Sequence, residues 1–194
     1  MTAKVREWFA NIQLDCEPCM DASYLSLWSR LRSGVAMNEI IYLKGDATCP
    51  QAKGVKIICH VCNDIGGWGK GFVLAISQRW VEPEEAYRKW YASGREGGFE
   101  LGAVQFVPVE PYIWVANLIG QRGTKTGSSG PPVRYEAIAG GLKLVAAKAL
   151  ELGASVHMPR IGCGLAGGEW SKVEPLILEH LCGRGVCVTV YDFE

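Results

Sequence analysis

From residue 38 onward the chain alternates between short apolar runs typical of β-strands and longer segments with the periodicity of α-helices. The expected strands are residues 39–44, 55–62, 102–110, 112–120, 155–161 and 186–193. The expected helices are residues 69–80, 82–94, 134–153 and 169–183. This alternation predicts an α/β fold with three layers, α/β/α, around a central sheet of about six strands. Because only a short turn at Pro111 separates two strands, they should form a hairpin, and the sheet should be mixed.

The composition limits the classes of function that fit this sequence. The 194 residues include 20 basic and 20 acidic side chains, so tight nonspecific binding to nucleic acid is not expected. No apolar run reaches the length of a membrane span, and the N-terminus lacks the apolar core of a signal peptide, which favours a cytoplasmic protein without membrane contact. Residues 1–36 are expected to be an N-terminal extension that could form two short helices, and residues 37–194 the globular domain. The oligomeric state stays open.

Eight cysteines leave disulfides, a metal site and buried thiols as alternatives. Without an export signal, disulfides are not expected. Cys16 and Cys19 form a C-x-x-C pair, but no second pair with matching ligand spacing follows. Cys59 and His60 are neighbours in one expected strand, so they should point to opposite faces of the sheet. We therefore expect buried thiols, no metal and no cofactor.

The segment MPRIGCGLAGGEW, residues 158–170, joins an expected strand to an expected helix and contains four glycines. Their spacing matches the G-x-G-x-x-G fingerprint of dinucleotide-binding folds, with Asp192 near the place of a ribose-binding acid. Such a fold needs further strands after that acid, whereas this sequence ends at Glu194, so the match is weak. A tight turn would need only one or two glycines. We therefore favour a loop whose main-chain N–H groups hold a phosphate at the start of a helix.

A second glycine-rich segment, CNDIGGWGKGF at residues 62–72, also joins a strand to a helix. Two such loops at the carboxyl ends of strands lie where α/β folds bind their ligands. Lys70 adds a cation, and Trp68 is either a wall of the site or a core residue. Asn63 and Asp64 could contact a sugar or position a water, or they could form an ordinary turn. Asp46, directly after the first strand, has a turn or helix cap as its alternative role.

In their order along the chain, the segments GDAT, HVCNDIGGWGKGFVLAISQRW, VANLIGQ, MPRIGCGLAGGEW and VTVYDF resemble the macrodomain family. The resemblance runs from about Met37 to Glu194. It is nearest to the branch that includes the module of a chromatin remodeller, the terminal ADP-ribose protein glycohydrolase and the yeast ADP-ribose-phosphate phosphatase. It implies a macrodomain fold with ADP-ribose as the ligand.

The resemblance also implies roles for individual residues. Asp46 would bind the adenine amino group. Asn63, Asp64 and the glycines from Gly66 to Gly71 would surround the distal ribose, and the backbone of residues 162–166 would wrap the diphosphate. The residues expected to bind the ligand are Asp46, Ala47, Asn63, Gly66, Gly67, Trp68, Gly69, Lys70, Gly71, Gln121, Gly162, Cys163, Gly164, Leu165 and Ala166.

The reaction is less directly indicated than the ligand. The glycohydrolase that the chain resembles uses a lysine and an aspartate, where this sequence has Gln121 and Ala166. Lys125 could replace that lysine only if its loop folded inward, so a covalent lysine route is not favoured. We instead expect hydrolysis of an ADP-ribose derivative by an activated water, with Asp64 and Asn63 as the catalytic candidates and His60 as a core residue.

Three kinds of ADP-ribose derivative fit that expectation: ADP-ribosylated protein, O-acyl-ADP-ribose and phosphorylated ADP-ribose. Two alternatives of other classes remain. One is a module that binds ADP-ribose without chemistry, and the other, supported only by the glycine spacing, is a nicotinamide-dependent oxidoreductase.

Overall fold

The computed structural model describes residues 39–127 and 130–192. The strands are β1 (Ile40–Lys44), β2 (Lys56–Asn63), β3 (Val104–Glu110), β4 (Ile113–Gln121), β5 (Ser155–Pro159) and β6 (Val188–Asp192). The helices are α3 (Phe72–Arg79), α4 (Glu82–Ser93), α5 (Tyr135–Leu152) and α6 (Trp170–His180), with short 3-10 turns η1 (Arg95–Gly97) and η2 (Cys182–Arg184). The expected N-terminal extension and its boundary at residue 37 lie outside the described residues.

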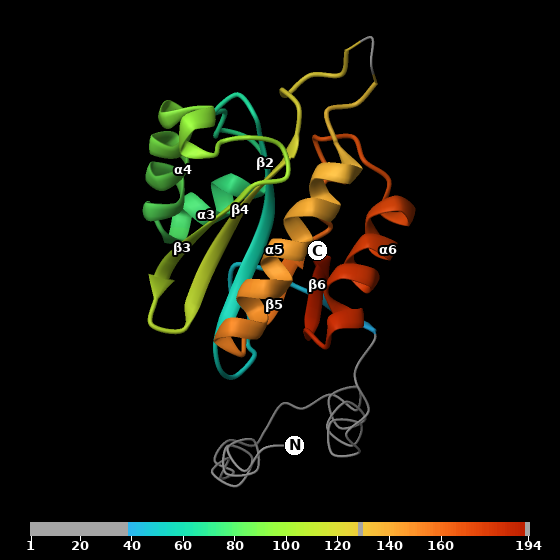
Figure 1. Ribbon diagram of the computed structural model, residues 1–194. Helices are drawn as coiled ribbons and strands as arrows, with labels where there is room; N and C mark the ends of the chain where they lie inside the picture. Colours follow the sequence, from blue (N-terminus) through green and yellow to red (C-terminus); the bar gives the residue numbers. More distant parts are fainter. Residues whose placement is uncertain (1–38, 128–129, 193–194) are drawn as a thin grey trace, which may run out of the picture. The chain divides into compact units, whose positions relative to one another are not determined.

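The strands form one six-stranded sheet in the order β1-β6-β5-β2-β4-β3. β3 runs antiparallel to β4, and every other neighbouring pair is parallel. The predicted hairpin and mixed sheet are therefore confirmed, as is the α/β fold. Figure 1 shows α3 and α4 on one side of β2 and β4, and α5 and α6 on the other.

Two apolar clusters hold the three layers together. Because side chains along β2 alternate between the two faces of the sheet, β2 contributes residues to both clusters. Ile57 and Cys59 pack with residues of α5 and α6, while Ile58 and Cys62 pack with residues of α3 and α4. His60 lies on the α3 side, with its ring centroid 5.4 Å from that of Trp68. The prediction that Cys59 and His60 face opposite ways is therefore confirmed, and it follows from the two-residue period of a strand.

Two element boundaries differ from the sequence prediction because of loop geometry. α3 begins at Phe72 instead of residue 69, since Gly71 has φ 80° and ψ −149°, which no helical residue adopts. β5 ends at Pro159 instead of residue 161, where a turn closes with the Cys163 N–H donating to the Arg160 carbonyl at 3.2 Å. Both shifts lengthen the glycine-rich loops at the expense of the flanking elements.

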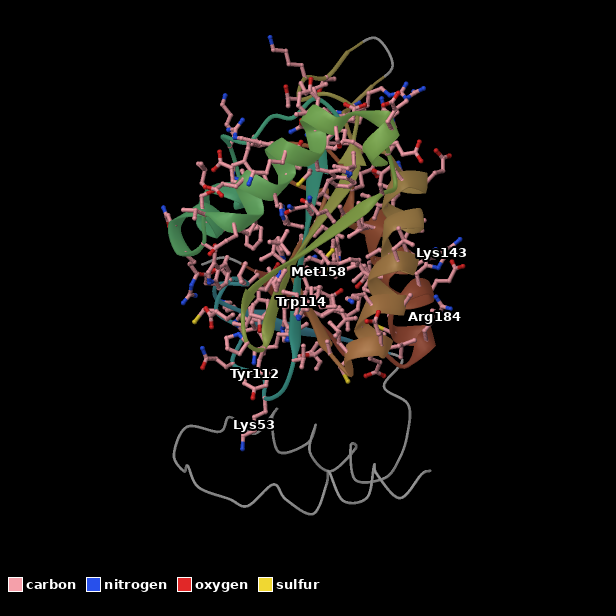
Figure 2. All side chains as sticks on the ribbon, turned by 60° about the vertical axis from the view of Figure 1, so that its left-hand side comes forward. Lys53, Tyr112, Trp114, Lys143, Met158 and Arg184 are labelled. Atoms are coloured by element: carbon pink, nitrogen blue, oxygen red, sulfur yellow. The ribbon has the colours of Figure 1, made fainter. Side chains whose placement is uncertain are left out.

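Since β1, β2, β4 and β5 run in the same direction through the sheet, the loops that follow them emerge at one end of it. The described parts of these loops are residues 45–55, 64–71, 122–127, 130–134 and 160–169. Lys53 and Tyr112, just before β2 and β4, mark the opposite end in Figure 2. Among the described residues, no helix combines the length and the apolar character needed to cross a membrane.

Candidate functional site

The first glycine loop, residues 63–71, is folded around the side chain of Asn63. The Asn63 Oδ1 accepts hydrogen bonds from the N–H groups of Ile65 at 3.1 Å and Gly67 at 2.8 Å, and its Nδ2 donates to the Gly67 carbonyl at 2.6 Å. Tyr87 Oη donates to the Asn63 carbonyl at 2.6 Å. Asn63 thus uses both ends of its amide to shape the loop, and its side chain is 7% exposed.

Beyond that anchored part, the first glycine loop presents main-chain donors. Within the described ranges, the N–H groups of residues 68–71 have no hydrogen-bond partner in the protein. They lead directly into the N-terminus of α3, which begins at Phe72. A run of unpaired N–H groups before a helix N-terminus carries partial positive charge and attracts anions.

The second glycine loop, residues 160–169, has the same property. Gly162 and Gly167 have φ of 72° and 69°, which favour glycine, and a Cβ on Gly168 would lie 2.5 Å from the Gly162 carbonyl oxygen. These three glycines are needed to form the loop itself. Across the part of the chain that the structure describes, the N–H groups of residues 164–166 find no partner, while the Ala166 carbonyl accepts a bond from the Val133 N–H at 3.1 Å.

The two glycine loops meet, because a Cβ on Gly71 would lie 3.5 Å from Cδ1 of Leu165. Leu165 is 68% exposed, so the contact lies at the surface. Gly69 and Gly164, one in each loop, have no positive φ, and no atom of the described residues lies within 4 Å of a Cβ added to either. The folded chain therefore does not require glycine at these two positions. A ligand that approaches the main chain would require it.

A cavity of about 340 Å³ lies beside the start of α3. It is lined by Gly45, Asp46, Ala47, Gly71, Phe72, Ala75, Pro159 and Tyr191. The two oxygens of Asp46 accept bonds from Thr48, from its N–H at 2.8 Å and its hydroxyl at 2.7 Å. The mostly apolar lining with one carboxylate fits a flat ring that carries an amino group. A more open groove of about 690 Å³ shares Asp46 and Ala75 with this cavity.

Asp64 lies at the end of β2 and ties the first glycine loop to the loop after β4. Its Oδ1 accepts a bond from the Gly123 N–H at 2.7 Å, and its Oδ2 lies 3.9 Å from Nε of Arg122. Gln121 Nε2 donates to the Gly123 carbonyl at 3.0 Å, so Gly123 is held from both sides. Oδ1 of Asp64 is thus fixed, whereas Oδ2 has, among the described residues, only a loose ionic contact with Arg122.

His60 is an interior residue, in agreement with the sequence prediction. It is 1% exposed, and its Nε2 donates to Oδ1 of Asn117 at 2.7 Å. The Asn117 amide in turn donates to the Pro83 carbonyl at 3.1 Å. Burial lowers the pKa of His60 to about 4, although the bond to Asn117 opposes the shift. His60 is therefore a neutral structural residue near pH 7.

Trp68 and three cysteines are also placed by burial. Trp68 is 8% exposed and packs on His60, so only its main chain reaches the surface of the loop. Burial raises the pKa of the Cys59 thiol to about 12 and that of Cys62 above its usual value. Cys163, in the second glycine loop, also has a pKa raised by burial. Among the described residues no group of three or more His, Cys, Asp or Glu side chains could hold a metal, and Cys16 and Cys19 lie outside them.

The sequence predicted helix α4 but not that it supports the first glycine loop. One face of α4 supports this loop. Tyr87 and Arg88 donate to the main-chain carbonyls of Asn63 and Trp68, and the ring of Tyr91 lies beside Gly66. Glu84, on the same face, accepts a bond from Ser77 of α3. The spacing of these α4 residues, three and four apart, was the available signal, because such residues share a helix face. The spacing alone does not say what that face packs against.

Two curated proteins resemble most of this chain. No family model matches the chain. The chromodomain-helicase-DNA-binding protein 1-like of Danio rerio is 35% identical over 164 residues, which is 79% of this chain and 16% of that protein. Its Mus musculus counterpart is 33% identical over 165 residues, 80% of this chain and 18% of that protein. The chain thus spans about a sixth of the length of the curated relatives it matches.

Two solved structures are matched over nearly their whole length. A protein of unknown function from Bacteroides thetaiotaomicron is 60% identical with a TM-score of 0.77, over 79% of this chain and 98% of that one. Thermosipho africanus DarTG in complex with ADP-ribose shares the fold at a TM-score of 0.57 and 19% identity, over 72% of this chain and 38% of that one.

A macrodomain protein from Streptomyces coelicolor is 64% identical, with a TM-score of 0.72, over 79% of this chain and 99% of that one. Identity at this level over nearly the whole of a named macrodomain identifies the fold and its family together. The chain therefore belongs to the macrodomain family.

Proposed function

We propose that this chain binds ADP-ribose, with the diphosphate between the two glycine loops. The observation that carries the proposal is the pair of N–H runs at residues 68–71 and 164–166, which have no partner among the described residues and belong to loops in contact. Uncharged N–H donors hold a diphosphate without basic side chains, which agrees with a net charge of zero. The bound ADP-ribose of the distant DarTG structure supports the choice of ligand.

The proposed pose follows from the order of the loops. Adenine would occupy the cavity of about 340 Å³, with its amino group directed to the Asp46 carboxylate. Gly71 lines this cavity and is also the last residue of the first glycine loop, so the diphosphate would lie at this loop, next to the adenosine. The distal ribose would then lie toward Asp64 at the end of β2.

Calorimetry with ADP-ribose and with NAD tests this proposal. We expect ADP-ribose to bind more tightly, because a nicotinamide on the distal ribose would add bulk near Asp64 and the loop after β4. Absence of ADP-ribose binding, or a preference for NAD, would overturn it.

We propose hydrolysis of an ADP-ribose derivative as a second function, because the Asp64 carboxylate is held rigidly at the proposed distal ribose with Oδ2 facing only Arg122. Asp64 would take a proton from a water whose oxygen bonds to the reacting centre, and the electron pair of the broken bond would leave with the departing group. Asn63 would act by shaping the loop, since both ends of its amide are engaged there. Gln121 and Ala166 offer no nucleophile, and Ala166 is 5% exposed.

Three substrates separate hydrolysis from simple binding: protein ADP-ribosylated on glutamate, O-acetyl-ADP-ribose, and ADP-ribose phosphorylated on its terminal ribose. Turnover of one of them above the enzyme-free rate would support hydrolysis and name the bond that is cleaved. Turnover at the enzyme-free rate on all three, with ADP-ribose still bound, would leave a non-catalytic binding module.

A further inference from the structure

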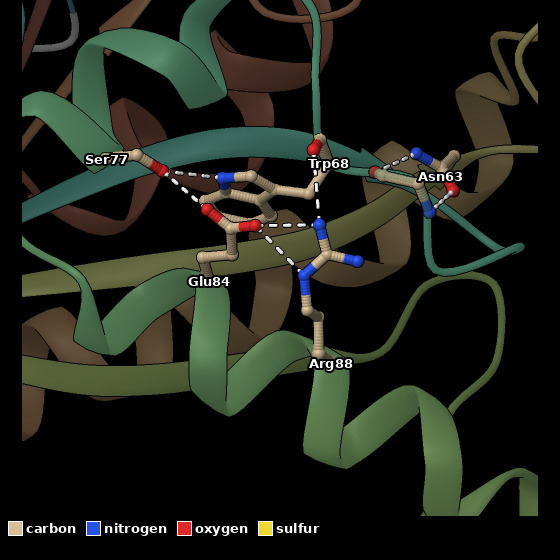
Figure 3. Close-up of polar contacts among 6 residues, drawn as sticks. Asn63, Trp68, Ser77, Glu84 and Arg88 are labelled. Carbon is tan, nitrogen blue, oxygen red and sulfur yellow. Dashed lines mark hydrogen bonds and ion pairs between the residues drawn. The ribbon is translucent and has the colours of Figure 1, made fainter.

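Trp68 in the first glycine loop is held at both its side chain and its main chain (Figure 3). Its indole N–H donates to Oγ of Ser77 at 2.8 Å, and Ser77 donates to Oε2 of Glu84 at 3.0 Å. Arg88 donates to Oε1 of Glu84 from Nε at 2.9 Å and from Nη2 at 2.7 Å, and Nη2 also reaches the Trp68 carbonyl at 3.4 Å. These four residues, the Trp68 circuit, form a closed ring of hydrogen bonds that begins and ends at Trp68.

The donors and acceptors of the Trp68 circuit are matched throughout. The indole and the guanidinium only donate, the Glu84 carboxylate only accepts, and the Ser77 hydroxyl does one of each. The side chains of Arg88 and Glu84 are 53% and 30% exposed, so their ion pair alone would add little to stability. Closing the ring fixes the geometry of a residue in the loop, which an isolated surface pair would not do.

The Trp68 circuit and Asn63 together determine where two of the loop's N–H groups point. In a trans peptide the carbonyl of one residue and the N–H of the next point in opposite directions. Arg88 draws the Trp68 carbonyl toward α4, and Asn63 Nδ2 holds the Gly67 carbonyl at 2.6 Å. The N–H groups of Trp68 and Gly69 must therefore point away from Asn63 and Arg88, and they have no partner among the residues the structure describes.

We propose that the Trp68 circuit is a positioning device that holds the Gly69 N–H in its anion-binding orientation before the ligand arrives; this rests on the proposed binding of ADP-ribose. Ser77, Glu84 and Arg88 act through Trp68 and do not touch the ligand. A loop already held in the binding conformation loses less entropy on association, and a smaller competent fraction weakens the apparent affinity in proportion.

Calorimetry on Ser77→Ala and Arg88→Ala tests the circuit, with Lys148→Ala as the matched control. Lys148 forms an ion pair with Glu151 at 2.9 Å on α5, outside both glycine loops. We expect ADP-ribose affinity to fall about tenfold in Arg88→Ala and by a smaller factor in Ser77→Ala, and to be unchanged in Lys148→Ala. Adenosine, which lacks the diphosphate, should keep its affinity in all three. Amide hydrogen exchange of Gly67, whose N–H bonds to Asn63 Oδ1 at 2.8 Å, should speed up in the ligand-free variants.

The outcomes separate this inference from the proposed function. If the wild-type protein does not bind ADP-ribose, the proposed function fails and the positioning role fails with it. If the wild type binds and both circuit variants bind ADP-ribose equally well, only the positioning role is overturned. Equal losses for adenosine and ADP-ribose would also overturn it, because a general structural defect would weaken both. Should Arg88→Ala not fold, Ser77→Ala decides, since it removes a single oxygen atom.

Discussion

At the scale of single residues, Gly164 is informative because the fold does not need it to be glycine. Its φ is not positive, and an added Cβ would meet no atom within 4 Å in the part of the chain that the structure describes. Gly164→Val should therefore fold normally yet weaken ADP-ribose binding more than 100-fold, because the branched side chain would occupy the position of the diphosphate. Calorimetry on the variant measures the loss.

Gly127→Val is the matched control for this substitution. Gly127 also lacks a positive φ, and no atom of residues 39–127 or 130–192 lies within 4 Å of an added Cβ, but it lies outside both glycine loops. It should keep wild-type affinity, and both variants should melt at about the wild-type temperature. Retained affinity in Gly164→Val would mean that the second glycine loop is only a turn.

Asp64 is the residue on which the hydrolysis proposal depends. In the wild-type structure, Asp64 Oδ1 accepts a bond from the Gly123 N–H at 2.7 Å, and the variant Asp64→Asn keeps this oxygen. The variant replaces Oδ2, the oxygen that would take the proton, with an amide NH₂ group. On a substrate that is turned over, kcat should fall about 100-fold, while the Kd for ADP-ribose stays within about twofold. Glu151→Gln on α5 controls for loss of one acidic charge. An unchanged kcat in Asp64→Asn would remove Asp64 from the mechanism.

At the scale of elements, two adjacent glycines of α5 differ in the space around them: Gly141 packs closely on β4, whereas Gly140 has room for a side chain. A Cβ on Gly141 would lie 2.5 Å from Cγ of Leu118, whereas one on Gly140 would come no closer than 3.9 Å, to Cα of Gly102. Gly141→Ala should lower the free energy of unfolding by about 1–3 kcal/mol through overpacking. Gly140→Ala should raise it by about 0.5–1 kcal/mol, the usual gain in helix propensity.

Urea unfolding of the two alanine variants measures this difference. Each substitution adds one methyl group to α5, so the gain in helix propensity is the same in both variants. The difference in their free energies of unfolding therefore reports the contact with β4. Equal effects of the two variants would show that α5 can shift on the sheet without cost.

The sequence predicted the secondary-structure elements and the glycine loops better than it predicted the contacts that support the site. The six strands, the hairpin and the two glycine loops were predictable because apolar periodicity and glycine density are local properties. The three-residue error at the start of α3 came from Gly71, whose φ of 80° is set by its place in the loop and not by its sequence neighbours. The support from Glu84 and Arg88 was not predictable, since Ser77 and Trp68 lie on other elements and a charged helix face usually lies in solvent.

At the scale of the whole molecule, two buried histidines make stability depend on pH. Burial lowers the pKa of His60 to about 4, and burial with the nearby charge of Lys56 does the same for His157. The unfolded chain, with histidine pKa values near 6.5, binds more protons than the folded chain between about pH 6.5 and pH 4. Stability is therefore full above that window and is lost as the pH falls through it, by about 1.4 kcal/mol per pH unit for each histidine.

Urea unfolding at pH 6.5 and at pH 5.0 tests this dependence with His157→Gln. Carboxylates also gain protons in this range, but they do so equally in both proteins, so the difference between the wild type and the variant isolates one histidine. The variant should lose about 1.5 kcal/mol less than the wild type between the two pH values. The substitution lowers absolute stability by breaking the bond between His157 Nε2 and Ser155 Oγ, which spans 2.8 Å, but this offset is present at both pH values and cancels. An identical pH dependence in the two proteins would show that His157 keeps an ordinary pKa in the folded chain and that the interior there admits its charged form.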